Sequence, residues 1–184
     1  MYIESNRLII KEFDLKDRFD LFRMVYQNDV VKFMKDWSDE IKHPDDFNGF
    51  INYMRSKSDC KDIQINKRYG VYLKETLQIV GMVGMGLEDT LNEVEMAYFI
   101  DDAYKGNGYA AEAVEALFQW CMSISDQPYM ILTIDSANHP SHRVAVKAGF
   151  ELFEIRKPVG HIQPNMVSDT YHYYRRLREV QWIS

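Results

Sequence analysis

A short glycine-rich segment, residues 105–110, combines residue types and spacing suited to binding a phosphate. It follows an apolar run at 94–100 that predicts a strand. It leads into apolar residues at three- and four-residue spacing, which predict a helix over 108–122. Gly106 and Gly108 let the backbone turn sharply and let a ligand approach closely. Because N–H groups and the positive dipole end meet at a helix N-terminus, the segment predicts a site for a phosphate-bearing cofactor.

The dinucleotide and nucleoside-triphosphate versions of such a turn fit this sequence poorly. A dinucleotide-binding turn has a third glycine and an acidic residue about 20 positions further on. Here Ala111 takes the glycine position, and Asp126 lies in a polar loop. A phosphate-binding G-x-x-x-x-G-K-[ST] element is also absent from the sequence. A plain tight turn remains the alternative for the pair of glycines taken alone.

A second segment has the order strand, polar loop, short helix and glycine stop. An apolar strand at 130–134 precedes Asn138, a helix is predicted over 141–148, and Gly149 ends it. With the motifs Y-x-G-x-G-Y-A-x-E-A at 104–113 and N-x-x-S…K-x-G-F from Asn138 to Phe150, the sequence resembles the GNAT superfamily of acyl-CoA-dependent N-acetyltransferases. Within it, the sequence is similar to the branch of bacterial ribosomal-protein N-terminal acetyltransferases. The opening 4–11 resembles the first strand of that branch, and the resemblance extends to about residue 176.

The resemblance implies acetyl-CoA as cosubstrate, with its pantetheine arm lying where one strand splays from its neighbour. Pantetheine would lie beside Phe99, Ile100 and Asp101, with Asn138 on its other side. The pyrophosphate would be held by the turn residues Lys105, Gly106, Asn107, Gly108, Tyr109 and Ala110. Arg143 and Lys147 are expected either at the nucleotide end or as exposed helix residues.

Acetyl transfer to an amine needs a group that takes a proton, because a free amine is mostly protonated at neutral pH. Glu95 occupies an E-x-x-Y position where relatives often place a carboxylate facing the acceptor. By strand alternation Glu93, Glu95 and Ala97 share one face. Glu95 is the predicted general base or water-orienting group. A surface carboxylate beside Glu93 is the alternative.

The residue that would donate to the leaving thiolate differs from the usual one of the superfamily. Many members of the superfamily carry a tyrosine seven residues after the asparagine, and this chain has Ala145 there. The ribosomal-protein branch has a serine three residues after the asparagine, which Ser141 matches. Ser141 is therefore either a catalytic hydrogen-bond donor to the thiolate or the N-cap of its own helix.

Composition narrows the class of protein. The 184 residues predict one domain, 1–184, and the net charge of −6 argues against nucleic acid as the main partner. No apolar run approaches the ~20 residues that span a bilayer, and no secretory signal opens the chain, so we expect a cytoplasmic protein without a membrane partner. Cys60 and Cys121 are too few for a zinc site, and His139 and His142 lack a third ligand, so no metal is expected.

The predicted elements form an α+β sandwich (α/β/α) around a mixed, largely antiparallel sheet of about seven strands with a central splayed pair. Strands are expected at 7–13, 69–73, 78–87, 93–100, 130–135, 150–157 and 168–176, and helices at 17–26, 30–35, 44–57, 108–122 and 141–148. The segment 33–41 is either an acceptor lid or a surface loop. The aromatic run 171–174 is expected to face the core on one side, and an acceptor wall or a homodimer contact on the other. The basic tract 175–178 is expected to be a solvated strand end.

The resemblance and the residues together favour an enzyme that transfers acetyl from acetyl-CoA to a primary amine by direct attack. The acceptor is expected to be a small-molecule amine or a peptide N-terminus. The alternative is a CoA-binding sensor or interaction protein that has this fold and little turnover. The absence of the usual tyrosine favours the sensor, whereas Glu95 and the intact turn favour the enzyme.

Overall fold

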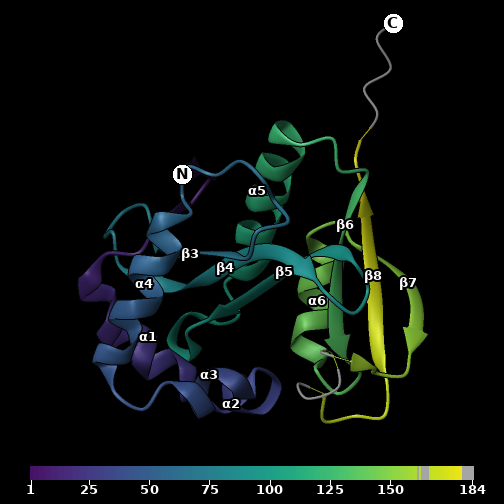
Figure 1. The fold of residues 1–184 in the computed structure, drawn as a ribbon, viewed down its shortest axis with the longest axis horizontal. Helices are drawn as coiled ribbons and strands as arrows, with labels where there is room; N and C mark the ends of the chain where they lie inside the picture. Colours follow the sequence, from purple (N-terminus) through teal and green to yellow (C-terminus); the bar gives the residue numbers. More distant parts are fainter. Residues whose placement is uncertain (161, 163–165, 180–184) are drawn as a thin grey trace, which may run out of the picture.

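Eight strands form one mixed sheet in the computed structural model, which describes residues 1–160, 162 and 166–179 (Figure 1). The sheet order is β1-β2-β3-β4-β5-β6-β8-β7, and only β5 and β6 pair in parallel. The strands are β1 Tyr2–Glu4, β2 Leu8–Lys11, β3 Lys67–Leu73, β4 Ile79–Glu88, β5 Glu93–Ile100, β6 Tyr129–Asp135, β7 Glu151–Arg156 and β8 Tyr171–Leu177. The α-helices are α1 Arg18–Val25, α2 Asn28–Phe33, α3 Lys35–Glu40, α4 Phe47–Ser56, α5 Tyr109–Ile124 and α6 His139–Lys147.

The observed elements confirm the predicted fold class. They differ from the predicted elements mainly at three points. β1 is a strand that alternation did not predict, because its three residues are too few for a pattern; it pairs with β2 from Tyr2↔Lys11 onward. Two short helices, α2 and α3, replace the single helix expected over 30–35. Finally, α6 begins at His139, two residues before the predicted start, because Pro140 fits the first turn of a helix.

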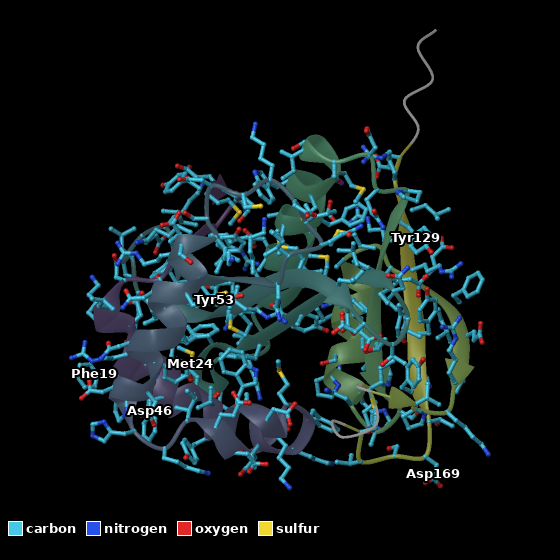
Figure 2. All side chains as sticks on the ribbon, in the orientation of Figure 1. Phe19, Met24, Asp46, Tyr53, Tyr129 and Asp169 are labelled. Atoms are coloured by element: carbon cyan, nitrogen blue, oxygen red, sulfur yellow. The ribbon has the colours of Figure 1, made fainter. Side chains whose placement is uncertain are left out.

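Each face of the sheet has its own helical layer and its own core. On one face α5 packs against β1, β2, β4 and β5, and its buried residues are those predicted from the spacing: Ala113, Val114, Leu117, Phe118 and Cys121, together with Met122. On the other face lie α1 to α4 (Figure 1). Figure 2 shows Met24 of α1, which is 0% exposed, within this layer and Phe19, which is 57% exposed, at its outer margin.

The parallel pair β5–β6 separates after one paired position, which divides the sheet into two halves. β4 and β5 pair along eight positions, whereas β5 and β6 share the single register pair Glu95↔Ile131. Figure 1 shows β3, β4 and β5 running across the view and β6 and β8 standing nearly upright. The splayed pair expected at the centre of the sheet is therefore present. Its opening lies beyond Glu95, towards the end of β5.

The basic tract at the end of β8 is not a solvated strand end, so that expectation is wrong. Arg176 is 10% exposed; it ion-pairs with Glu115 of α5 and donates to the carbonyl of Ala148 (2.6 Å). Arg178 donates to the carbonyls of Met122 (2.6 Å) and Gln127 (3.1 Å). Arg178 thus holds β8 against the C-terminal end of α5, where helix carbonyls lack intrahelical partners. Arg176 connects β8 to the middle of α5 and to the end of α6.

Candidate active site

The glycine-rich turn after β5 has the backbone geometry that its two glycines predict. Gly106 and Gly108 have φ of 83° and 81°, in the left-handed region that side chains other than glycine rarely adopt. Gly108 is the N-cap residue of α5, and the helix begins at Tyr109. The first N–H groups of a helix have no intrahelical acceptor, so this turn offers several donors at the positive end of a 16-residue helix.

Arg7, from the connection between β1 and β2, holds the turn from its outer side. Its guanidinium donates to Glu112 Oε2 (2.8 Å) and to the carbonyl of Asn107 (2.9 Å), and it lies 4.7 Å from the ring centre of Tyr109. Ser5 donates to the same carboxylate (2.7 Å). The sequence motif contains Glu112, but no local spacing indicates that its partners lie more than 100 positions away. Only the fold reveals this clamp.

A pocket of about 320 Å³ lies between the turn and α6, and we call it the turn pocket. All but two of the predicted cofactor-binding residues line it: Phe99, Ile100, Lys105, Gly106, Gly108, Tyr109, Ala110, Asn138, Arg143 and Lys147. They come from β5, the turn, α5 and α6. The structure thus brings together residues that are up to 48 positions apart, from Phe99 to Lys147.

Asp101 and Asn107 are the two predicted residues that do not line the turn pocket. The buried carboxylate of Asp101 accepts from Gln27 (2.8 Å) and ion-pairs with Arg23, so it connects β5 to α1. Its N–H donates to the carbonyl of Val80 (2.9 Å). The Asn107 amide donates to the carbonyl of Tyr104 (3.0 Å) and closes the turn on itself. Both side chains have structural partners in the protein.

Lys105 ion-pairs with two carboxylates at the rim of the turn pocket. Its ammonium lies 2.7 Å from Asp29 and also contacts Asp102. Burial lowers the pKa of Lys105, but the hydrogen bonds to Asp102 and Asp29 outweigh that effect, so the net pKa is raised. The ammonium is therefore charged at neutral pH and available as a phosphate contact only in competition with these carboxylates.

The N-cap of α6 is Asn138, so the alternative in which Ser141 caps this helix is wrong. Asn138 Oδ1 accepts from the N–H of Ser141 (3.3 Å), which puts Ser141 in the first turn. The Tyr98 hydroxyl donates to the carbonyl of Ser141 (3.1 Å) and ties this turn to β5. Burial raises the pKa of Tyr98, so its hydroxyl keeps its proton. No pattern in the sequence indicates this role for Tyr98.

A second pocket, of about 300 Å³, lies on the α1–α4 side of the sheet, and we call it the Glu95 pocket. Glu95 Oε1 accepts from the N–H of Thr133 (3.0 Å) and from its hydroxyl. Burial raises the pKa of Glu95 to about 7, against the opposing effect of the Thr133 hydrogen bonds. A carboxyl group with this pKa can accept a proton near neutral pH. Thr133, which sequence reasoning missed, fixes one oxygen and leaves the other for a ligand.

The two pockets meet at the opening between β5 and β6. Five residues line both of them: Phe33, Met34, Tyr98, Asn138 and Ser141. The segment 33–41 contributes Asp36 and Trp37 to the Glu95 pocket. Trp37 is not on a loose loop, because it lies in α3 and its ring contacts Phe50 (5.0 Å between ring centres) and Phe99 (6.3 Å). A molecule in one pocket can therefore reach a molecule in the other.

Residues 7–151 match the acetyltransferase (GNAT) domain. The chain belongs to the GNAT acetyltransferase family. It is 24% identical over 149 residues to the uncharacterized N-acetyltransferase YnaD of Bacillus subtilis, covering 81% of this chain and 82% of that one. As a GNAT acetyltransferase it is an enzyme of acetyl-CoA-dependent N-acetylation.

Solved structures of this family share its architecture. A GNAT acetyltransferase from Bacillus anthracis superposes with a TM-score of 0.74 at 23% identity, covering 96% of this chain and 98% of that one. The ribosomal-protein α-N-acetyltransferase RimL, solved with coenzyme A, superposes with a TM-score of 0.75 at 16% identity and the same coverage. At these identities the likeness establishes the α+β fold with its mixed sheet.

Two further observations describe this GNAT acetyltransferase over residues 1–160, 162 and 166–179. No helix in that part has the length and apolar character that crossing a bilayer requires. No three His, Cys, Asp or Glu side chains in it gather as a metal ion would require.

Proposed function

We propose that this enzyme transfers acetyl from acetyl-CoA, bound in the turn pocket, to a primary amine bound in the Glu95 pocket, by direct attack of the amine. The observation that carries the proposal is the meeting of the two pockets at Tyr98, Asn138 and Ser141. An acetyl group delivered from one side of the splayed strands meets an amine delivered from the other. Holding both reactants in one opening supplies the orientation that such a transfer needs.

The residues of the turn pocket fit the phosphate end of coenzyme A. A Cβ at Gly106 would meet nothing within 4 Å, so the backbone there lies open to a ligand. Donors at the start of α5 and the cations Lys105, Arg143 and Lys147 surround the same space. Apolar residues, Phe99 and Ile100, line the part towards the opening, which suits the pantetheine arm. RimL, whose structure contains coenzyme A, supports the same assignment by analogy of fold.

Glu95 is the proton acceptor in the proposed reaction. The amine nitrogen bonds to the thioester carbonyl carbon, its proton passes to Glu95 directly or through water, and coenzyme A leaves as the thiolate. Thr133 holds one carboxylate oxygen, which directs the other towards the pocket. Ser141 lines both pockets and donates a hydrogen bond to the leaving sulfur. A hydroxyl is a poor acid by pKa, so its contribution is a hydrogen bond and not proton transfer.

The test is product formation with a panel of primary amines, following CoA thiol release and the acetylated amine by mass spectrometry. We expect equal amounts of thiol and acetylated amine. Varying both substrates should give intersecting initial-rate lines, because direct attack requires a ternary complex. Parallel lines with an acetylated protein would contradict direct attack, since they indicate a covalent intermediate. Coenzyme A binding without thiol release for every amine would favour the sensor.

A further inference from the structure

Arg68 of β3 lies across the neighbouring strand β4 on the floor of the Glu95 pocket. Arg68 pairs with Gly84, and Gly84 pairs with Ala97 of β5, so the three residues form one row across the sheet. A Cβ on Gly84 would lie 2.3 Å from Arg68 Cδ. It would also lie 2.3 Å from the carbonyl oxygen of Lys67. Glycine at this position therefore leaves room both for the β3 backbone and for the arginine to lie flat over β4 towards β5.

The guanidinium of Arg68 is held in place and keeps donors free. Its Nη1 donates to the carbonyls of Lys67 (3.0 Å) and Met85 (3.1 Å). Within residues 1–160, 162 and 166–179, neither Nε nor Nη2 has a hydrogen-bond acceptor, and Arg68 forms no ion pair. Burial lowers the pKa of Arg68 to about 10, and the charge of Glu95 opposes this effect, so the group is charged at neutral pH. A charged, partly buried guanidinium without an ion-pair partner in contact is costly unless a ligand supplies one.

The acidic residues around the same pocket are either used by the protein or lie at the rim. Asp135 accepts from the N–H groups of Val167 (2.6 Å) and Ser168 (2.9 Å). Glu88 accepts from the N–H of Leu91 (2.6 Å), and Asp36 is exposed. Two groups remain for an acceptor: Glu95 for its amine and Arg68 for an anionic oxygen. Glu95 lies on the same sheet face as Ala97, two residues along β5.

We propose that Arg68 binds a carboxylate on the acceptor, so that the substrate is an amine carrying a carboxylate, as an amino acid does, and not a polyamine. The inference rests on the proposed function of the Glu95 pocket. Arginine matches a carboxylate through paired N–H donors, and its two unused nitrogens, Nε and Nη2, lie on one edge of the guanidinium. A polyamine would put a second positive charge beside Arg68, which the pocket disfavours.

The experiment compares amino acids with their carboxamides as acceptors, using apolar, acidic and basic side chains. For the wild-type enzyme we expect kcat/KM to favour at least one acid over its amide. Arg68→Gln should lower that acid-to-amide ratio at least tenfold, mainly through KM for the acid, and Arg68→Lys should give an intermediate ratio. Comparing this ratio between the wild type and each variant cancels the different reactivity of the two amines. Arg55→Gln, which removes an exposed cation of α4, is the matched control and should leave the ratio unchanged.

A binding measurement separates this inference from the proposed function. The CoA complex is titrated by calorimetry with N-acetyl amino acids and N-acetyl amino acid amides, and this readout needs no turnover. Arg68-dependent binding of the acid without thiol release would uphold the inference and reject the transfer. Transfer to amides and acids alike, with a ratio unaffected by Arg68→Gln, would overturn the inference and leave the transfer standing. If Arg68→Gln weakened acids and amides equally, Arg68 would bind a neutral carbonyl oxygen of the acceptor, and the inference would also be overturned. Unchanged CoA affinity of the variant checks its folding.

Discussion

The turn pocket and the Glu95 pocket differ in how the chain builds them. Much of the turn pocket comes from one continuous stretch, 98–111, and its chemistry lies in backbone amides and two glycines. The Glu95 pocket takes side chains from α3, β3, β4, β5 and β6. The first is a local motif that other strands and helices hold in place. The second exists only when distant segments pack together.

This difference predicts that the two pockets tolerate substitutions differently. Backbone donors survive most side-chain substitutions, so the turn pocket depends mainly on φ angles that glycine allows. In the proposed reaction the Glu95 pocket depends on the identity of each side chain, because one carboxyl, one hydroxyl and one guanidinium would supply its chemistry. We expect substitutions of the Glu95 pocket to change turnover and substitutions of the turn to change cofactor affinity.

The largest expected effect is on turnover, from Glu95→Gln. Glutamine keeps the shape but cannot take a proton at neutral pH, so kcat should fall about 10²–10⁴-fold, or ~3–5 kcal/mol of transition-state stabilisation. The acidic limb of the wild-type rate should lie near pH 7, because Glu95 is protonated below its raised pKa of about 7 and cannot act as a base. The measurement is the pH dependence of kcat/KM, with acetyl-CoA affinity unchanged.

Glu93→Gln is the matched control for that prediction. Glu93 lies on the same face of β5 but accepts from Tyr129 (2.6 Å) and Tyr173 (2.7 Å), outside the Glu95 pocket. The Glu93→Gln variant should retain the wild-type rate and the acidic limb of the pH profile. If Glu95→Gln also retained them, the acceptor would lose its proton to solvent or to another group, and Glu95 would be a structural carboxylate.

The next effect is on cofactor affinity, from Gly108→Val. A β-branched residue at φ 81° is strained by roughly 1–2 kcal/mol or more, and relief of that strain moves the turn. The dissociation constant of CoA should rise by well over tenfold, where tenfold equals ~1.4 kcal/mol. Calorimetry measures it, and kcat at saturating acetyl-CoA should change far less. Gly49→Val, at an open position of α4, is the control. Unchanged affinity in a folded Gly108 variant would place the cofactor elsewhere.

Ser141→Ala is expected to have a smaller effect on turnover. Loss of one hydrogen bond to the leaving sulfur should reduce kcat by roughly fivefold to tenfold, since such a bond contributes ~1 kcal/mol. Thermal stability should stay unchanged, because Asn138 caps α6. Asn138→Ala, in contrast, should lower the free energy of unfolding by ~1 kcal/mol through loss of the cap. A loss of stability in Ser141→Ala with full turnover would reverse the roles given to these two residues.

The smallest effect is expected from Thr133→Val, and it concerns the pH dependence that Glu95 controls. The Thr133 hydroxyl donates to the charged form of Glu95, so its removal raises the pKa of Glu95 further. The acidic limb should therefore move to higher pH, by roughly half to one unit for a hydrogen bond of ~1 kcal/mol. Thr133→Ser keeps the hydroxyl and should keep the limb. A limb that did not move would show that another group controls it.

Local patterns predicted most of the elements but not where distant side chains meet. The spacing in α5 identified its buried face, and the alternation in β5 put Glu93, Glu95 and Ala97 on one face, where each is partly buried. The start of α6 was placed two residues late, which left Ser141 as a candidate cap, because Asn138 lies outside the apolar period and Pro140 is equally typical of a loop. The prediction for the basic tract failed because the partners of Arg176 and Arg178 lie on α5, far away in the chain.

The sequence by itself determined the strand, turn and helix that surround Gly106 and Gly108, since hydrogen bonding and φ preference act between neighbours in the chain. It also determined that Glu95 lies on one face of its strand, because side chains alternate. The tertiary structure alone decided that Arg7 clamps the turn, that Thr133 holds Glu95 and that Arg68 lies over Gly84. Those contacts join strands and loops from different parts of the chain. They depend on sheet order and register, which no short-range pattern records.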